Sequence, residues 1–147
     1  KYNDLLRLEG PIGTFSYRKD DSKNIVFIAN GTGIAPVVSI LESILPNASV
    51  KKNIHVFWGL RYEKDSYIDF TSGFKGINFH PVFSREKVDN SYFGYVQDAV
   101  LNYNIDISIS TIFACGSENM IKSANEKFLK KGLDHSKFFS DAFVSSN

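Results

Sequence analysis

Short apolar runs alternate along the chain with segments in which apolar residues recur at helical spacing. The first run, residues 26–29, is continuously apolar, as is typical of a strand buried on both faces of a parallel sheet. Gly31 and Gly33 follow it, and apolar residues at helical spacing then extend over residues 34–45. Pro36 is tolerated in the first turn of a helix, because its missing N–H has no intrahelical acceptor there. The pattern therefore predicts a strand, a glycine turn and a helix.

The rest of the chain repeats this alternation. We expect strands at residues 54–60, 77–83, 111–115 and 138–143, helices at residues 63–74, 94–103 and 120–131, and a polar loop at residues 86–93. Ser117 is a good N-cap for the last helix, and Gly132 is suited to end it. Strands alternating with helices across short connections predict an α/β fold, a doubly wound parallel sheet in three αβα layers. Such sheets bind ligands at the carboxyl ends of their strands.

The first twenty residues do not fit this alternation. Residues 5–17 alternate as a strand does around a Gly-Pro-Ile-Gly turn, yet no earlier strands are available to pair with them. The chain begins with Lys1, and its only methionine is Met120. We therefore expect a piece of a longer protein, in which residues 1–20 are the last strand and linker of another domain and residues 21–147 are a domain of their own.

Composition narrows the classes of function. The chain has 147 residues, 43% of them hydrophobic, which suits one globular domain. A net charge of +1 gives no electrostatic reason to expect nucleic acid or an anionic membrane as a partner. A single cysteine, the lack of a signal peptide and the lack of a spanning apolar run favour a cytoplasmic location. His55, His80 and His135 show no ligand spacing, so no metal site is expected.

The glycine turn is suited to hold an anion. A helix that begins just after Gly31 and Gly33 points its unpaired N–H groups and its positive dipole end at whatever lies over the turn, which favours pyrophosphate. No Lys-Ser or Lys-Thr follows, which argues against a nucleoside triphosphatase loop. The common dinucleotide fingerprint is incomplete, because Pro36 replaces its third glycine and no acid ends the strand at 54–60. A dinucleotide site of another pattern and a turn with a purely steric role both remain open.

Seven motifs, taken in order, carry a resemblance to one family. They are LEGPIGTFSYR, IANGTGIAP, FWGLR, FSRE, GYVQDAV, ACGSENM and FFSDAFVSS. Together they resemble the ferredoxin-NADP reductase-like flavoprotein reductases over nearly the whole chain. LEGPIGTF and FFSDAF are most similar to reductases that join an iron-sulfur, a flavin and a nicotinamide domain, such as those of oxygenases and of CDP-sugar deoxygenation. The resemblance implies the Rossmann-like NAD(P)-binding domain of such a reductase.

The same resemblance implies what lies outside this domain. Residues 5–17 would be the last strand of the preceding FAD-binding barrel. The Arg-x-Tyr-Ser segment that holds the flavin in the family is absent, so this piece alone should hold FAD poorly or not at all. The implied partners are that FAD domain and a ferredoxin-like domain or protein electron acceptor, with a 2Fe-2S cluster elsewhere in the parent protein.

On the nicotinamide side, the resemblance assigns two motifs and the chain end. The GTGIAP motif would bind pyrophosphate through Gly31, Thr32, Gly33, Ile34 and Pro36, with Thr32 also close to the flavin edge. The CGSENM motif would supply Cys115, Gly116, Glu118 and Met120, with the thiol beside the reacting carbon, and Phe143 would lie near the isoalloxazine. From position alone, a cysteine such as Cys115 is more often an inert buried residue, Glu118 could equally serve the helix dipole, and Phe143 could be ordinary packing.

On the adenosine side, Arg61, Ser84, Arg85 and Tyr95 are similar to the clamp for the 2'-phosphate and adenine in NADP-specific members. Guanidinium groups suit a phosphate through bidentate hydrogen bonds. However, Phe93 and Gly94 replace the lysine of those members, and Asp65 could accept a ribose hydroxyl instead. We therefore expect NADH slightly more than NADPH, with solvated arginines as the alternative.

The expected activity is that of the parent protein, a flavoprotein oxidoreductase that passes hydride from NAD(P)H to FAD and electrons on to an iron-sulfur centre or protein acceptor. This chain alone would be inactive. Two alternatives stay open: a free flavin reductase or electron-transfer subunit, and a nucleotide-binding module without turnover.

Overall fold

Six parallel strands form one sheet in the order β4-β3-β2-β1-β5-β6. The computed structural model describes residues 20–47 and 51–142. The strands are β1 (Asn24–Asn30), β2 (Asn53–Leu60), β3 (Asn78–Phe83), β4 (Tyr92–Phe93), β5 (Ser110–Gly116) and β6 (Phe138–Ala142). Strand β1 lies between β2 and β5, and helices pack on both faces of the sheet, so β1 is buried on both faces, and this explains its continuous apolar run.

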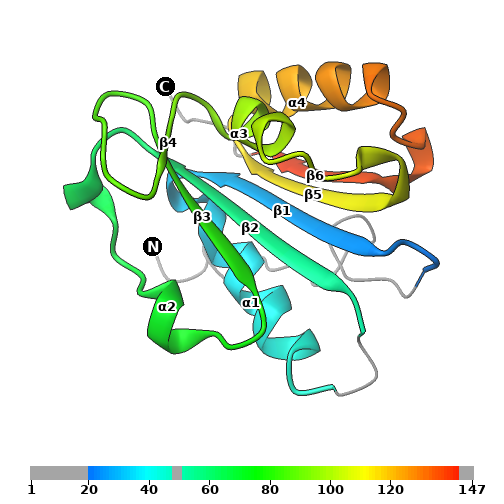
Figure 1. Cartoon of the computed structure of the whole chain (residues 1–147), viewed down its shortest axis with the longest axis horizontal. Coiled ribbons are helices and arrows are strands. Elements are labelled where there is room, and N and C mark those ends of the chain that lie inside the picture. Colours follow the sequence, from blue (N-terminus) through cyan, green and yellow to red (C-terminus); the bar gives the residue numbers. More distant parts are fainter. Residues whose placement is uncertain (1–19, 48–50, 143–147) are drawn as a thin grey trace, which may run out of the picture.

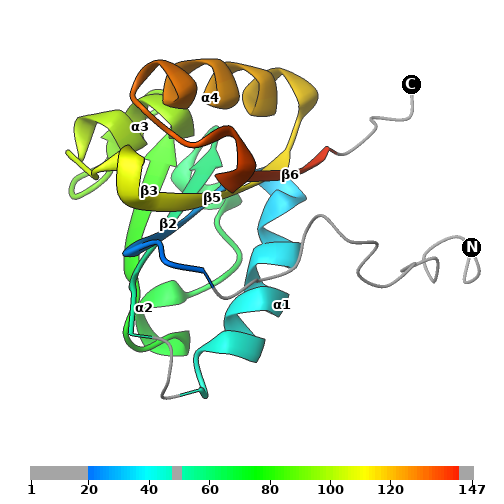
Figure 2. The same cartoon turned by 90° about the vertical axis from the view of Figure 1, so that its right-hand side faces the viewer.

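Helices cover both faces of the sheet. Helices α1 (Ile34–Ile44) and α2 (Phe70–Gly73) pack on one face, and α3 (Val96–Asn102) and α4 (Glu118–Lys130) pack on the other. Figure 2 shows the three layers edge-on, with α3 and α4 above the strands and α1 and α2 below them. This arrangement confirms the predicted doubly wound α/β fold (Figure 1).

Two hydrophobic clusters, one on each face, hold the layers together. Alternate residues of each strand contribute to opposite clusters, so that Phe27 joins the α1 side while Val26 and Ile28 join the α3 side. Phe27 stacks on Phe113 of β5 with ring centroids 5.2 Å apart, which links the neighbouring strands β1 and β5. Burying such side chains supplies the main favourable free energy of folding, at roughly 25 cal/mol per Å² of apolar surface.

One predicted helix is wrong. Residues 63–74 form a 3-10 turn at Glu63–Asp65 and the four-residue helix α2 in place of one continuous helix. Local side chains close each turn: Asp65 accepts a hydrogen bond from the backbone N–H of Tyr62, and Asp69 accepts from those of Thr71 and Ser72. Asp, Ser and Thr compete in this way with the backbone ladder of a helix, and periodicity alone does not reveal that competition.

The loop predicted at residues 86–93 contains one further element. Its last two residues form β4, which pairs with Val82 and Phe83 and makes one edge of the sheet. A two-residue strand is too short to leave an alternating pattern in the sequence. The expected strand at residues 5–17 and the domain boundary at residue 20 lie in or next to the part of the chain that is not described, so both stay predictions.

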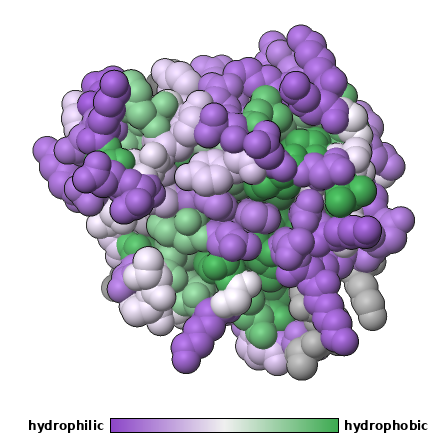
Figure 3. Space-filling model, in the orientation of Figure 1, coloured by the Kyte–Doolittle hydropathy of each residue, from purple (hydrophilic) through white to green (hydrophobic). Residues whose placement is uncertain are grey.

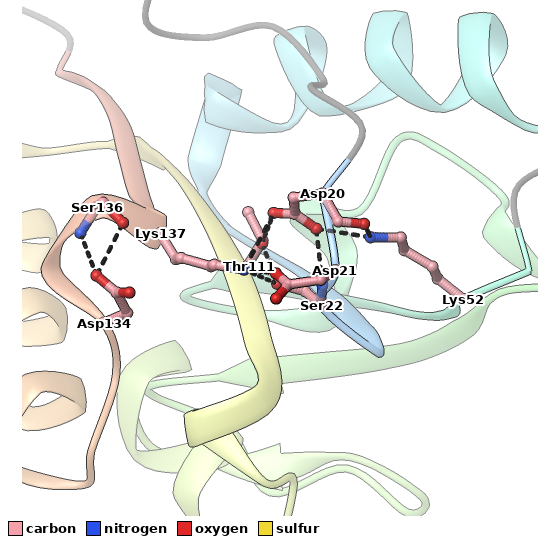
Figure 4. A network of polar contacts seen from close by, with 8 residues as sticks. All are labelled: Asp20, Asp21, Ser22, Lys52, Thr111, Asp134, Ser136 and Lys137. Carbon is pink, nitrogen blue, oxygen red and sulfur yellow. Dashed lines mark hydrogen bonds and ion pairs between the residues drawn. The ribbon is translucent and has the colours of Figure 1, made fainter.

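A polar network closes the sheet at the amino ends of its strands (Figure 4). Asp20 accepts hydrogen bonds from Lys52 Nζ at 2.6 Å, from the backbone N–H of Ser22 at 2.9 Å and from the Thr111 hydroxyl. Lys137, just before β6, forms ion pairs with Asp20 and Asp21. Burial alone would raise the pKa of Asp20, but the hydrogen bonds outweigh it and hold that pKa well below its usual range. We call these residues the amino-edge network.

Figure 3 shows apolar areas near the middle of one face and hydrophilic residues around them. On β2 and β3, His55 and His80 are only half-buried, and Tyr103 after α3 is 41% exposed, so this part of the sheet is partly open. Within residues 20–47 and 51–142, no helix combines the length and the apolarity needed to cross a bilayer.

Candidate functional site

A cleft of about 1240 Å³ opens at the carboxyl ends of the strands. Its walls are the segments that follow β1, β2, β3 and β5, together with the first turns of α3 and α4. Helix α1 leaves the end of β1 toward one face of the sheet, whereas α4 leaves the end of β5 toward the other. The strand order therefore reverses between β1 and β5, and at such a point the diverging connections leave room for a ligand.

The turn after β1 forms the floor of the cleft. Gly31 has φ +55°, a left-handed conformation that costs glycine little, and no atom lies within 4 Å of where its Cβ would be. Its carbonyl accepts a hydrogen bond of 2.8 Å from the indole Nε1 of Trp58. Thr32 is exposed on the cleft wall, and α1 begins two residues later. The turn thus presents the backbone of Gly31 and Thr32 to the cleft just ahead of the start of α1, an arrangement that favours an anion.

Gly33 serves a different purpose from Gly31. A Cβ at Gly33 would lie 2.2 Å from the backbone oxygen of Cys115, so glycine is needed for α1 to approach β5 this closely. Gly33 does not line the cleft. Gly33 therefore serves the packing of α1 on β5, and its contact with pyrophosphate stays a prediction.

Asn30 joins the two loops that meet at the strand reversal. Its side-chain Nδ2 donates to Ser117 Oγ at 3.0 Å, and its Oδ1 accepts from the backbone N–H of Ser117 at 3.0 Å. A Cβ at Gly116, whose φ is +147°, would lie 1.7 Å from Asn30 Oδ1. Ser117 Oγ also accepts from the N–H of Met120, which caps α4 as predicted. These bonds fix the separation of the two sides of the cleft.

Cys115 is fully buried and does not line the cleft. Burial, with a smaller effect from nearby Asp141, raises the pKa of its thiol to about 12, so the thiol stays neutral at ordinary pH. A neutral thiol agrees with an expected role in contact and orientation rather than as a nucleophile. The described structure does not place it against the cleft space, and its contact with nicotinamide stays a prediction.

The adenosine-side residues are divided by the structure. Arg61, Ser84 and Tyr95 line the cleft, whereas Arg85 is exposed but does not. Asp65 also lines it, so a carboxylate and one guanidinium face the same space. The opposing charge of Asp65 bears directly on whether a 2'-phosphate is accepted.

The predicted site residues fall into three groups. Those on the cleft wall are Gly31, Thr32, Arg61, Ser84, Tyr95, Gly116, Glu118 and Met120; those away from it are Gly33, Ile34, Pro36, Arg85 and Cys115. Phe143 lies outside the described residues. The cleft thus brings together residues from five separate motifs, while their roles toward a ligand stay predictions.

Some cleft residues were missed by the sequence analysis. Gln97, in the first turn of α3, is only 7% exposed; its Nε2 donates to Ser123 Oγ, and its Oε1 has no hydrogen-bond partner among the described residues. Tyr67 lines the cleft and is 60% exposed. The Tyr-Val-Gln motif contained a signal for Gln97, whereas Tyr67 lies in the segment that was wrongly expected to be a helix. A buried acceptor without a partner is one that a ligand N–H or O–H can satisfy.

The described part of the chain has no cluster of side chains suited to bind a metal ion. No group of three or more His, Cys, Asp or Glu side chains there is placed to hold an ion. The polar groups of the candidate site are therefore those of its backbone turn, its charged side chains and the buried amide of Gln97.

Comparison with known proteins identifies the family. The model of the oxidoreductase NAD-binding domain matches residues 27–126, and the chain belongs to this family. This confirms the resemblance inferred from the motifs and makes a nicotinamide dinucleotide the family's class of ligand.

Particular relatives narrow the comparison. The chain is 41% identical to the CDP-6-deoxy-L-threo-D-glycero-4-hexulose-3-dehydrase reductase of Yersinia pestis, over 99% of this chain and 45% of that protein. It is 35% identical to protein RfbI of Salmonella typhimurium, again over 99% and 45%. The fold is similar to that of the Amycolatopsis cytochrome P450 reductase GcoB, with TM-score 0.79 and 24% identity over 91% of this chain and 42% of that one. The chain thus spans less than half the length of these proteins.

Proposed function

We propose that this domain binds NADH as the nicotinamide-nucleotide part of a flavoprotein reductase. The observation that carries the proposal is the cleft at the β1–β5 reversal, with the open Gly31 turn on its wall and α1 beginning just after Gly33, in a chain that belongs to an NAD-binding family. The unpartnered Gln97 oxygen and the exposed turn fit a ligand that carries both hydrogen-bond donors and phosphates.

The residues divide the dinucleotide among them. The Gly31–Thr32 backbone and the N-terminus of α1 hold the pyrophosphate. Arg61, Tyr95 and Gln97 hold the adenosine part, with Tyr95 supplying an aromatic face and Gln97 an acceptor. The nicotinamide end would lie near Gly116, at the end of β5, and Glu118, which both line the cleft.

NADH is preferred to NADPH because of charge. Asp65 accepts a ribose hydroxyl readily but repels a 2'-phosphate, and Arg85, the second arginine of the expected clamp, is not on the cleft wall. A phosphate there would face one guanidinium and one carboxylate instead of two guanidinium groups. The 2'-phosphate, which is doubly charged, would therefore add little to the binding free energy of NADPH.

The whole protein is proposed to be a reductase with further domains. Residues 1–20 would close a preceding FAD-binding barrel, and a 2Fe-2S centre and a protein acceptor would receive the electrons, in a cytoplasmic protein that resembles the CDP-6-deoxy-hexulose-3-dehydrase reductase of Yersinia pestis. When bound together, reduced nicotinamide and FAD supply hydride transfer. This domain's residues bind and orient the dinucleotide.

Calorimetric titration of the chain with NADH, NADPH, AMP and 2'-phospho-AMP tests the proposal. We expect saturable binding that is tighter for NADH and AMP than for their 2'-phosphorylated counterparts. Asp65→Asn should narrow that preference, because it removes the repelling charge. Glu126→Gln, an exposed acid on α4 away from the cleft, is the matched control and should leave the preference unchanged.

Each part of the proposal has its own contrary result. Tighter binding of the 2'-phosphorylated ligands would make this an NADPH domain and refute the role of Asp65. No binding of any of the four ligands at millimolar concentration would refute the dinucleotide site itself, although the fold would stand.

A further inference from the structure

We infer that Trp58 is a positioning residue for the dinucleotide: its indole N–H fixes the peptide that faces the pyrophosphate. The inference rests on the proposed function, since it names what aligns that same site. It concerns a residue that is 1% exposed and has no place on the cleft wall.

The key contact joins β2 to the turn after β1. Trp58 lies beside Ala29 in the parallel register, and its Nε1 donates to the carbonyl of Gly31 at 2.8 Å. Gly31 has a left-handed backbone conformation, and glycine can adopt several other backbone conformations of similar energy. A hydrogen bond to its carbonyl therefore selects one of them. A buried indole N–H generally has a partner, and here that partner is a backbone atom of the cleft floor.

Planarity of the peptide carries this constraint to the ligand. The carbonyl of Gly31 and the N–H of Thr32 belong to one trans peptide and point in opposite directions. With the carbonyl held toward the buried indole, the N–H of Thr32 is directed to the other side of the turn. Thr32 is exposed there and lines the cleft. Trp58 thereby orients a backbone donor that is suited to a phosphate oxygen.

The indole also supports a second wall of the cleft. Its ring meets Tyr67 edge to face, with centroids 5.1 Å apart and planes at 88°, and Tyr67 lines the cleft. The indole also meets Phe70 of α2 edge to face, with ring centroids 6.0 Å apart. One buried ring therefore connects the phosphate turn, the Tyr67 wall and the helix layer, and Phe70 belongs to the packing alone.

Trp58→Phe tests the role because it keeps an aromatic ring and removes the N–H. We expect the variant to fold and to bind ADP-ribose about tenfold more weakly, since the Thr32 amide is no longer held in place. Binding of AMP, which lacks the pyrophosphate, should change by less than about twofold. A purely structural role would weaken both ligands equally, so the ratio of the two changes is the decisive readout.

Phe70→Leu is the matched control. It disturbs the same aromatic cluster without touching the turn, so it should lower the melting temperature while leaving the ratio of ADP-ribose to AMP affinity unchanged. An unchanged affinity of Trp58→Phe for ADP-ribose would refute the positioning role while leaving the proposed function intact. Absence of binding by the wild-type chain would refute the proposed function, and the positioning role with it.

If Trp58→Phe does not fold, an NMR measurement on the wild-type chain tests the positioning role of Trp58. The chain has one tryptophan, so its ¹⁵N-labelled form gives a single indole resonance. We expect that resonance to exchange slowly with solvent and to shift on addition of ADP-ribose. A resonance that stays unmoved at saturating ADP-ribose would overturn the inference.

Discussion

The two ends of the sheet differ in how their polar groups are satisfied. At the amino end, the carboxylate of Asp20 accepts three hydrogen bonds from within the protein, and Lys137 forms ion pairs with Asp20 and Asp21. At the carboxyl end, the Gly31 turn is open and the Gln97 oxygen has no partner among the described residues. Both ends are rich in polar residues, so composition does not distinguish them. What distinguishes a binding edge from a structural edge is polar capacity left free for a ligand.

Stability and ligand binding are therefore expected to depend on opposite ends of the sheet. Substitutions in the amino-edge network should lower the free energy of unfolding and leave the ligand site alone. Most substitutions around the cleft should change affinity with little loss of stability, because the groups there have few partners to lose. Gly33 is the instructive exception, since it lies at the carboxyl end and serves packing.

The largest effect is expected from Gly33→Ala. The new Cβ would lie 2.2 Å from the backbone oxygen of Cys115, which cannot move without displacing β5. We expect a loss of about 3 kcal/mol or more in urea unfolding, together with weaker NADH binding. Gly73→Ala is the control, because no atom lies within 4 Å of its added Cβ. Equal stability of the two variants would show that α1 can shift away from β5 without cost.

A smaller effect is expected from Asp20→Asn. The variant leaves Lys52, whose side chain is 11% exposed, without its charged partner, which should cost about 2 kcal/mol at pH 7. The pKa of Asp20 is lowered on folding, so its stabilisation is complete above the unfolded pKa of about 3.9 and is lost as the pH falls below it. Between pH 7 and pH 3, the free energy of unfolding should therefore fall less in the variant than in the wild type.

Asp21→Asn is the matched control for Asp20→Asn. Its side chain is 93% exposed, so its ion pair with Lys137 should matter little. NADH binding should be unchanged in both variants. A loss of affinity in Asp20→Asn would contradict the separation between the two ends of the sheet.

The smallest effect is expected from pH and the histidines of β2 and β3. His55 Nδ1 lies 3.1 Å from His80 Nε2, and burial, followed by the neighbouring His55, lowers the pKa of His80 to about 4. Because the unfolded chain takes up a proton first, stability should be complete above pH 6.5 and fall between pH 6.5 and pH 4.

His80→Phe should remove part of that fall while keeping the stacking on Phe57. We expect the melting temperature to change less between pH 7 and pH 5 than in the wild type, by about 3 °C. His135→Gln, which alters the one histidine outside this pair, should not change the slope. An identical slope in all three proteins would place the pH dependence elsewhere.

The sequence predicted the fold from features that are local and repeated. Continuous apolar runs marked the buried strands, and Ser117 marked the start of α4. It failed at residues 63–74, where Asp65 and Asp69 close short turns. It missed β4, because two residues leave no periodic pattern.

The candidate site was predictable to a lesser extent. Motif residues such as Gly31, Ser84 and Gly116 lie on the cleft wall. The different tasks of Gly31 and Gly33 could not be read from their identical letters, because the close approach of Gly33 to β5 depends on a strand that lies some eighty residues further along. The contact between Trp58 and Gly31 is likewise a product of strand register.

The Lys137–Asp21 ion pair has a consequence for how the domain is assembled. It joins residues 116 positions apart, across nearly the whole described chain. Contacts between such distant residues form late in folding, because the intervening loop must be closed before they bring any stabilisation. During synthesis β1 leaves the ribosome before Lys137, so the amino-edge network stays incomplete until residue 137 has emerged. The described part of the domain is therefore complete only once β6 has docked at the edge of the sheet.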